Sequence, residues 1–263
     1  MYKLSKIQLI ALLLVRIIGV VLFQFFLLFF LSTWDKTIPW WPFAMIMTEI
    51  VCCLILIKLL RLENKSFWSI QYMPFDKSLP FGKVSRYING NYSKNRSINF
   101  VINLMLFIAL LLLLGFPAIL IKDYIYRSVP ILNEINIFGV LPGFALCTIT
   151  LLLPITQALI EFPWFFGYIY PRLEASFDVD GKNAKIKASL KSFTIVIFFF
   201  TLQTALIPLI INFDYFIWRA IAMIPILIVI GIVVRVFPRF MPHINVLHAV
   251  MAISVVMEYW KLV

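Results

Sequence analysis

The chain of 263 residues is 63% hydrophobic and 13% charged, about half the charged fraction of an ordinary soluble domain. A water-soluble protein of this size could not bury so much apolar surface, and its long apolar runs lack the short alternating segments of an outer-membrane barrel. The net charge of +11 is typical of basic cytoplasmic loops in a membrane protein rather than of nucleic-acid binding. These features exclude a soluble enzyme, a disordered chain and a porin, and predict an all-α polytopic membrane protein.

Seven apolar runs are long enough to cross a hydrocarbon core of about 30 Å as helices. They cover residues 7–31, 40–60, 97–121, 138–161, 192–212, 217–234 and 244–260. The first run is too long for a signal peptide and has no small-residue cleavage site, so we expect it to remain as a helix. Because the chain shows no internal repeat and no soluble segment of its own, residues 1–263 are expected to form a single transmembrane domain of about seven helices in one bundle.

The segments between these runs alternate in positive charge. With the N-terminus in the cytoplasm, the inner segments carry 17 lysines and arginines and the outer segments carry 5. Basic residues concentrate on the cytoplasmic side of membrane proteins. The sequence therefore predicts a multi-pass protein of a cell membrane, with a cytoplasmic N-terminus and an external C-terminus.

The longest loop, residues 61–96, interleaves basic with aromatic side chains. This mixture suits a segment that lies on an anionic inner leaflet, so membrane lipid is an expected partner. A plain solvated loop is the alternative. Trp34, Trp40 and Trp41, around Pro39, are expected to anchor the outer end of the first hairpin at the membrane interface.

Ionisable residues within the apolar runs are the first candidates for function, because charge inside a bilayer is costly. Arg16 and Glu49 lie in the first two runs, where they are expected to pair with each other or with lipid headgroups. Glu161 ends the fourth run. His248 lies in the seventh run, one turn after Asn245, and the polar residues of the fifth run are Thr201, Gln203 and Thr204.

A buried glutamate beside a histidine could activate a water molecule as a general base. The alternative is structural, with Glu161 at a helix end near the interface and His248 bonded to a carbonyl of a neighbouring helix. The chain lacks the common hydrolase and nucleotide-binding motifs. Its three cysteines lie in apolar runs without disulfide or zinc spacing, so we expect neither metal nor cofactor.

The segment from Gln157 to Glu174 resembles the first motif of the CPBP family, the CAAX-prenyl-type and bacteriocin-processing glutamic intramembrane proteases also called Abi. That motif has two adjacent glutamates, three further residues and then Arg-Gly, commonly followed by a Pro-Arg-Leu-like stretch. Glu161 takes the position of the first glutamate, and residues 167 and 171–173 fit the frame. Phe162 stands in place of the second glutamate and Phe166 in place of the arginine.

Two later segments resemble the second and third motifs, so that the resemblance covers about residues 140–260. The second motif, Phe followed four residues later by His, matches Phe200 but has Thr204 at the histidine position. The third motif, His followed four residues later by Asn or Asp, keeps His248 but has Ala252 as its partner.

The resemblance implies the roles that these positions have in that family. The first glutamate and the second-motif histidine activate a water molecule, and the third-motif residues stabilise the oxyanion. The substitutions then imply a pseudoprotease, a degenerate member that serves as a binding or accessory partner of a membrane protein, an exported peptide or a lipid-linked substrate. Its vestigial catalytic residues would be Glu161 and His248, its altered positions Phe162, Phe166, Thr204 and Ala252, and its polar cavity residues Gln203 and Asn245. We expect Glu161, Thr204 and His248 to converge.

Two alternatives to this function stay open. The first is a working intramembrane endopeptidase that uses Glu161 and His248 with Gln203 or Thr204 as a substitute partner. The second is a small transporter or channel subunit, although the seven uneven runs lack the inverted repeat common among transporters.

Overall fold

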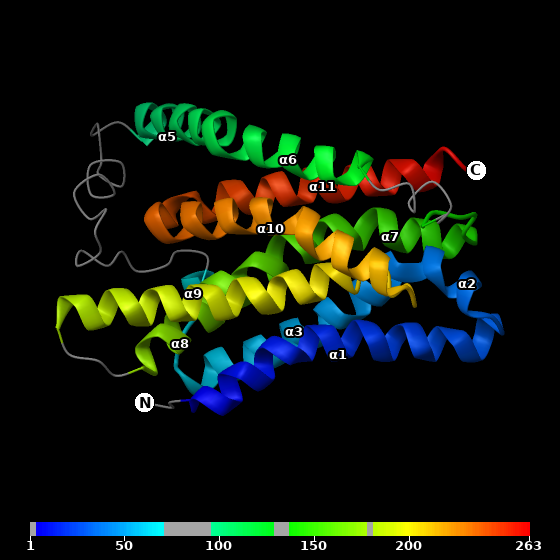
Figure 1. Ribbon diagram of the computed structural model, residues 1–263, viewed down its shortest axis with the longest axis horizontal. Helices are drawn as coiled ribbons and strands as arrows, with labels where there is room; N and C mark the ends of the chain where they lie inside the picture. Colours follow the sequence, from blue (N-terminus) through cyan, green and yellow to red (C-terminus); the bar gives the residue numbers. More distant parts are fainter. Residues whose placement is uncertain (1–3, 71–95, 129–136, 178–180) are drawn as a thin grey trace.

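The computed structural model describes residues 4–70, 96–128, 137–177 and 181–263. Along these residues the chain forms helices and no strand, and the helices run roughly side by side in one elongated bundle, with the N- and C-termini at opposite ends (Figure 1). Seven helices are long and apolar enough to cross a membrane, which confirms the all-α polytopic fold. These spans are Lys6–Leu31, Trp34–Leu62, Ser97–Ile125, Gly143–Ala175, Asn183–Ala205, Phe213–Val236 and Pro238–Trp260.

The spans consist of α-helices interrupted by short 3₁₀ and π segments. The elements of the first three spans and the segment after the second are α1 (Lys6–Leu31), α2 (Trp34–Thr37), η1 (Ile38–Trp40), α3 (Trp41–Leu62), η2 (Phe67–Ile70), α5 (Arg96–Leu110), η3 (Leu111–Gly115) and α6 (Phe116–Arg127). Those of the last four are α7 (Gly143–Thr156), η5 (Gln157–Glu161), η6 (Pro163–Ile169), α8 (Tyr170–Ala175), α9 (Lys182–Ala205), α10 (Phe213–Val236), η7 (Pro238–Phe240) and α11 (Met241–Trp260).

The first helix shows how local sequence sets an end of a span. Ser5 and Gln8 form a capping box in which the side chain of each accepts from the backbone N–H of the other, satisfying donors that a helix start leaves unpaired. At the other end Ser32 adopts a left-handed conformation and its N–H donates to the carbonyl of Leu28. These local signals make α1 a defined span of 26 residues.

The fourth span is longer than the sequence predicts. The expected run ended at residue 161, but the helix continues through η5, η6 and α8 to Ala175. Residues 160–170, which include many aromatic side chains, are all buried, so this stretch is part of the bundle core rather than an interfacial segment. The prediction that Glu161 ends the span is therefore wrong, and the structural alternative of a carboxylate at an interfacial helix end is wrong with it.

Two further expectations are corrected by burial and helix length. The fifth span is Asn183–Ala205 instead of 192–212, because its basic beginning is already helical although it is not apolar. The side chain of Trp41, which was expected to contact lipid headgroups as an anchor, is buried against protein in an apolar cluster of the bundle. Most of the loop expected on the inner leaflet, residues 71–95, lies outside the described residues.

The packing of the helices leaves one span at the edge. Helix α1 packs on α3 and α9, α7 packs on α3 and α11, and α10 packs on α9 and α6. The span of α5 and α6 lies along the margin of the bundle in Figure 1, and only 6% of its most apolar window is buried. The interior between the other helices therefore holds the buried polar groups, while α5 and α6 form a peripheral wall.

Candidate functional site

A cluster of polar side chains lies within the bundle, with one member from each of α1, α3, η5, α9 and α11. Glu161 is its centre, because three other members contact this carboxylate. Nη2 of Arg16 lies 3.3 Å from Oε1 of Glu161, Nε2 of Gln203 donates to the same oxygen at 2.9 Å, and Nε2 of His248 lies 3.2 Å from Oε2. Nη2 of Arg16 also donates to Oε1 of Glu49 at 2.9 Å. We call these five residues the ion network.

Arg16 and Glu49 are completely buried and pair with each other, the first of the two expected possibilities. The Nε and Nη1 atoms of Arg16 donate to no described residue, and the guanidinium carbon lies 5.6 Å from the centre of the Phe165 ring, within cation–π range. With two carboxyl groups and one guanidinium, the ion network becomes neutral when it holds one additional proton among Glu49, Glu161 and His248. Because uncompensated charge is costly in a low-dielectric interior, such a neutral arrangement is strongly favoured.

Aromatic rings pack against His248 and against one another next to Glu161. Phe162 lies against the imidazole of His248 with ring centres 4.4 Å apart. Phe165 stacks on Phe200 at 4.4 Å with nearly parallel planes, and Phe166 lies 6.0 Å from the same ring. All four phenylalanines are buried. The two positions at which the family motif has a glutamate and an arginine are thus filled by packed rings.

The remaining candidates lie outside the direct contacts of Glu161. Thr204 donates to the carbonyl of Thr201, and its own carbonyl accepts from Arg219. Asn245 is buried on α11, and Ala252 is buried in a second apolar cluster. The structure brings Glu161 and His248 together, but the residue of α9 that contacts Glu161 is Gln203 rather than Thr204, one position and about 100° away on the helix.

Arg16 and Glu49 are members of the site that sequence reasoning did not assign to it. Their presence in apolar runs was a sufficient signal that each needs a partner. The sequence gave no indication that the same arginine would also contact Glu161, because that contact depends on how α1, α3 and the fourth span pack.

A second polar group lies at one end of the bundle, around the residue that follows α3. Both carboxylate oxygens of Glu63 accept hydrogen bonds from the guanidinium of Arg172, and Oε1 also accepts from the hydroxyl of Tyr168. Nζ of Lys65 lies 3.2 Å from Oε2 of Glu63. Burial alone would raise the pKa of Glu63. The hydrogen bonds from Arg172 and Tyr168 and the charge of Arg172 outweigh that effect and lower the pKa from 4.5 to about 2.

This lowered pKa predicts an acid-dependent loss of stability. A carboxyl group whose pKa is lowered by folding stabilises the protein fully above its unfolded pKa, and that stabilisation disappears as the pH falls through the folded pKa. We expect the contribution of Glu63 to decline between pH 4.5 and about 2, and Glu63→Gln to lack this component. Thermal unfolding in detergent across this range measures it, with Glu258→Gln, which alters an exposed pair with Lys261, as the control. Equal acid sensitivity of wild type and Glu63→Gln would contradict the prediction.

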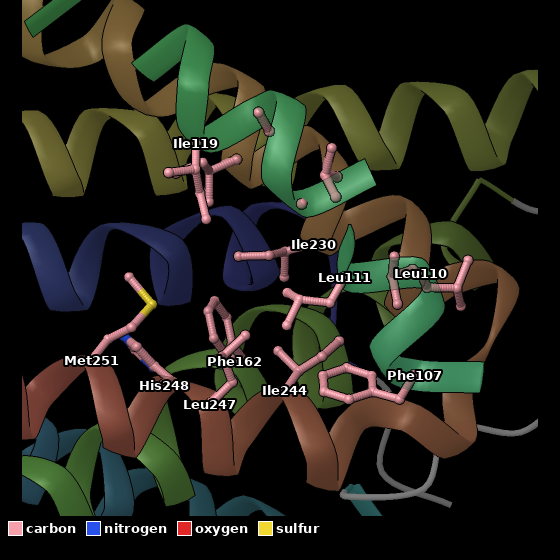
Figure 2. A pocket seen from close by; sticks show the side chains of 15 residues that line it. Phe107, Leu110, Leu111, Ile119, Phe162, Ile230, Ile244, Leu247, His248 and Met251 are labelled. Atoms are coloured by element: carbon pink, nitrogen blue, oxygen red, sulfur yellow. The ribbon is translucent and has the colours of Figure 1, made fainter. Parts of the chain in front are cut away.

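An apolar cavity of about 90 Å³ adjoins the ion network between α5, α6, α10 and α11. Figure 2 shows its wall, in which Phe162, Leu247 and His248 face Leu111, Ile119 and Ile230. His248 is the one lining residue with a polar side chain group among those described. This imidazole therefore contacts the cavity on one side and Glu161 on the other.

The fold and these contacts define a polytopic α-helical membrane protein with an internal ion network beside an apolar cavity. Within the described residues, no three His, Cys, Asp or Glu side chains are arranged as metal ligands. Comparison with protein-family models, with curated protein sequences and with solved structures finds no match to this chain. The site must therefore be interpreted from its own geometry.

Proposed function

We propose that the protein is a non-catalytic membrane protein that binds a membrane protein, an exported peptide or a lipid-linked molecule, and that its site is a degenerate form of a CPBP-like glutamic protease site. One observation carries this proposal. Both oxygens of Glu161 are already engaged, Oε1 by Arg16 and Gln203 and Oε2 by His248. A general base must accept a proton from a water molecule within hydrogen-bond reach. Three of the roughly four acceptor directions of this carboxylate already point to protein groups, and Glu161 is only 4% exposed.

The surroundings of Glu161 support the same interpretation. The buried rings of Phe162, Phe166 and Phe200 pack against one another, beginning at the residue that follows Glu161, in a region where a hydrolase would need access for water. Replacing a buried ion pair by apolar packing is often neutral or stabilising, so a chain that lost its activity could keep its fold with Phe162 and Phe166.

The proposal predicts that purified protein has no peptidase turnover and that Glu161→Gln retains its biological function. Glutamine keeps the shape of the side chain and its hydrogen-bonding capacity, and it leaves the hydrogen bond from Arg16 to Glu49 in place. The two assays are cleavage of candidate membrane peptides and complementation in cells, each with wild type and Glu161→Gln. Cleavage by wild type that is absent in Glu161→Gln would overturn the proposal.

An active intramembrane endopeptidase is the second candidate, and a specific observation favours it. Glu161 and His248 lie 3.2 Å apart, and the imidazole reaches a cavity of about 90 Å³. In this alternative Gln203 would orient Glu161 in place of the missing histidine. The cleavage assay above separates the candidates, because only the peptidase loses turnover in Glu161→Gln.

We also propose that the N-terminus is cytoplasmic, on the basis of the charge asymmetry, and that the membrane is a bacterial cytoplasmic membrane, on the basis of the resemblance to the CPBP family. Lys36 and Lys185, both exposed, belong to oppositely placed segments in this topology. After replacement of the three native cysteines by serine, a membrane-impermeant maleimide should label Lys36→Cys on intact cells and Lys185→Cys only after permeabilisation. Efficient labelling of Lys185→Cys on intact cells would contradict the proposed orientation.

A further inference from the structure

The cavity beside His248 reaches the surface of the bundle that faces lipid. Ile119 and Met251, on its wall, are 39% and 47% exposed. Ile119 belongs to the peripheral span, whose neighbours on α6 include the exposed Phe116 and Leu120. In a polytopic membrane protein this surface is in contact with hydrocarbon. The cavity is therefore continuous with the interior of the bilayer rather than with water.

The size and chemistry of the cavity restrict what can occupy it. A helix is about 10 Å across with its side chains and does not fit a space of about 90 Å³. An extended peptide would bring backbone N–H and C=O groups against an aliphatic and aromatic wall that cannot satisfy them. The end of a hydrocarbon chain is narrow and carries no polar group. Since a cavity of about 150 Å³ holds one benzene molecule, a terminal segment of a few carbons meets both restrictions.

We propose that this cavity binds one hydrocarbon chain of a membrane lipid, which enters between Ile119 and Met251 and ends against Phe162 and His248. The chain would restore the dispersion contacts that the wall lacks when the space is empty. Transfer from bilayer to cavity is not driven by the hydrophobic effect, since both are apolar. Occupancy instead follows from packing and from the high local concentration of lipid chains.

A bound chain would touch the ion network through one residue. Nε2 of His248 lies 3.2 Å from Oε2 of Glu161, and the imidazole packs at a tilt against the Phe162 ring. Both rings line the cavity. A chain end at this point would cover the side of His248 that faces away from Glu161 and keep water from it. The inference goes beyond the proposed function and does not depend on it, because it concerns lipid binding whether or not Glu161 is catalytic.

The test uses the full chain in nanodiscs of phosphatidylcholine that contain a fraction of the same lipid with a diazirine at the end of one acyl chain. After illumination, peptide mass spectrometry locates the attached lipid. We expect label on cavity residues, above all on Phe162, Leu247 and His248, in excess of the label on exposed residues such as Ile155 and Phe198. Label spread over the exposed residues with none enriched in the cavity would overturn the proposal.

Two exposed methionines of α11 provide a matched pair of variants. Met251 is at the rim of the cavity, whereas Met257 is 58% exposed and does not line it. We expect Met251→Trp to block the entrance and reduce cavity labelling to that of the exposed residues, and Met257→Trp to leave it unchanged. Unchanged labelling in Met251→Trp would contradict the proposed entrance and the proposal with it.

A second pair tests the interior of the cavity. Ala118 is buried and lines the cavity, while Ile121 on the same helix is 49% exposed and does not. We expect Ala118→Phe to fill the space and abolish cavity labelling, with Ile121→Phe as the control. Thermal unfolding of each variant establishes that it is folded, and labelling that persists in a folded Ala118→Phe would overturn the proposal. None of these measurements involves cleavage, so failure of this inference and failure of the proposed function are distinguishable.

Discussion

Replacing Arg16 by methionine is expected to destabilise the protein by about 3–5 kcal/mol, the range found when one partner of a buried ion pair is removed. Arg16 is completely buried and contacts the carboxylates of both Glu49 and Glu161. Without the guanidinium, two carboxyl groups would share the interior with no arginine from the described residues beside them. Unfolding in mixed micelles measures the loss. Ile18→Met, at a half-exposed position of the same helix, should change stability little.

The double variant Arg16→Met/Glu49→Gln separates loss of charge balance from loss of packing. Glutamine removes the carboxylate that has lost its guanidinium partner, and Glu161 keeps its contacts with Gln203 and His248. We expect the double variant to regain about 2 kcal/mol relative to Arg16→Met, since residues in one buried network are strongly non-additive. No recovery would show that the loss comes from packing rather than from charge balance. A loss of less than about 1 kcal/mol in the single variant would show that the ion network contributes little to the fold.

Substitution of Gly167 by alanine is expected to have the second large effect. A Cβ atom at this position would lie 2.3 Å from the backbone carbonyl oxygen of Ile70, so the segment that carries Ile70 would have to move. Overpacking of this kind costs about 1–3 kcal/mol. The displacement would also disturb the hydrogen bonds of Glu63 with Tyr168 and Arg172, which join the same two segments.

Gly143→Ala is the matched control, because a Cβ atom there has nothing within 4 Å. We expect its stability to be unchanged or slightly higher, as alanine is the better helix former. Thermal unfolding of both variants gives the comparison, and limited proteolysis should cleave more rapidly near residues 63–70 in Gly167→Ala alone. Equal stability of the two variants would contradict the close approach of Gly167 to Ile70.

Hydropathy and charge were sufficient to predict seven spans in an all-α bundle, because the physical requirement for each span is local: about 20 apolar residues. The same reasoning gave wrong span ends where the helical residues are buried in the protein core or are not apolar. The fourth run was expected to end at Glu161, yet residues 162–170 continue the span and are buried in its core. The basic start of α9 was assigned to a loop because lysines lower the mean hydropathy without preventing a helix.

The candidate site was predictable only in part, for a related reason. Glu161 and His248 were identified because each is ionisable within an apolar run, and the structure puts them 3.2 Å apart. The rotation of α9 about its axis decides whether Gln203 or Thr204 contacts Glu161. The sequence does not specify that rotation to within one residue. The contribution of Arg16 depends on the packing of three spans, and no spacing along the chain encodes it.

The ion network also bears on how the protein is made. Arg16 and Glu49 lie on the first two spans, whereas His248 lies on the last. During synthesis from the N-terminus, the arginine and the first glutamate therefore enter the bilayer long before the rest of their partners exist. Each charge alone would oppose insertion by about 2.5–3.5 kcal/mol. Their contact within the α1–α3 hairpin lets the two spans enter as a nearly neutral unit, and Glu161, Gln203 and His248 join that unit in chain order.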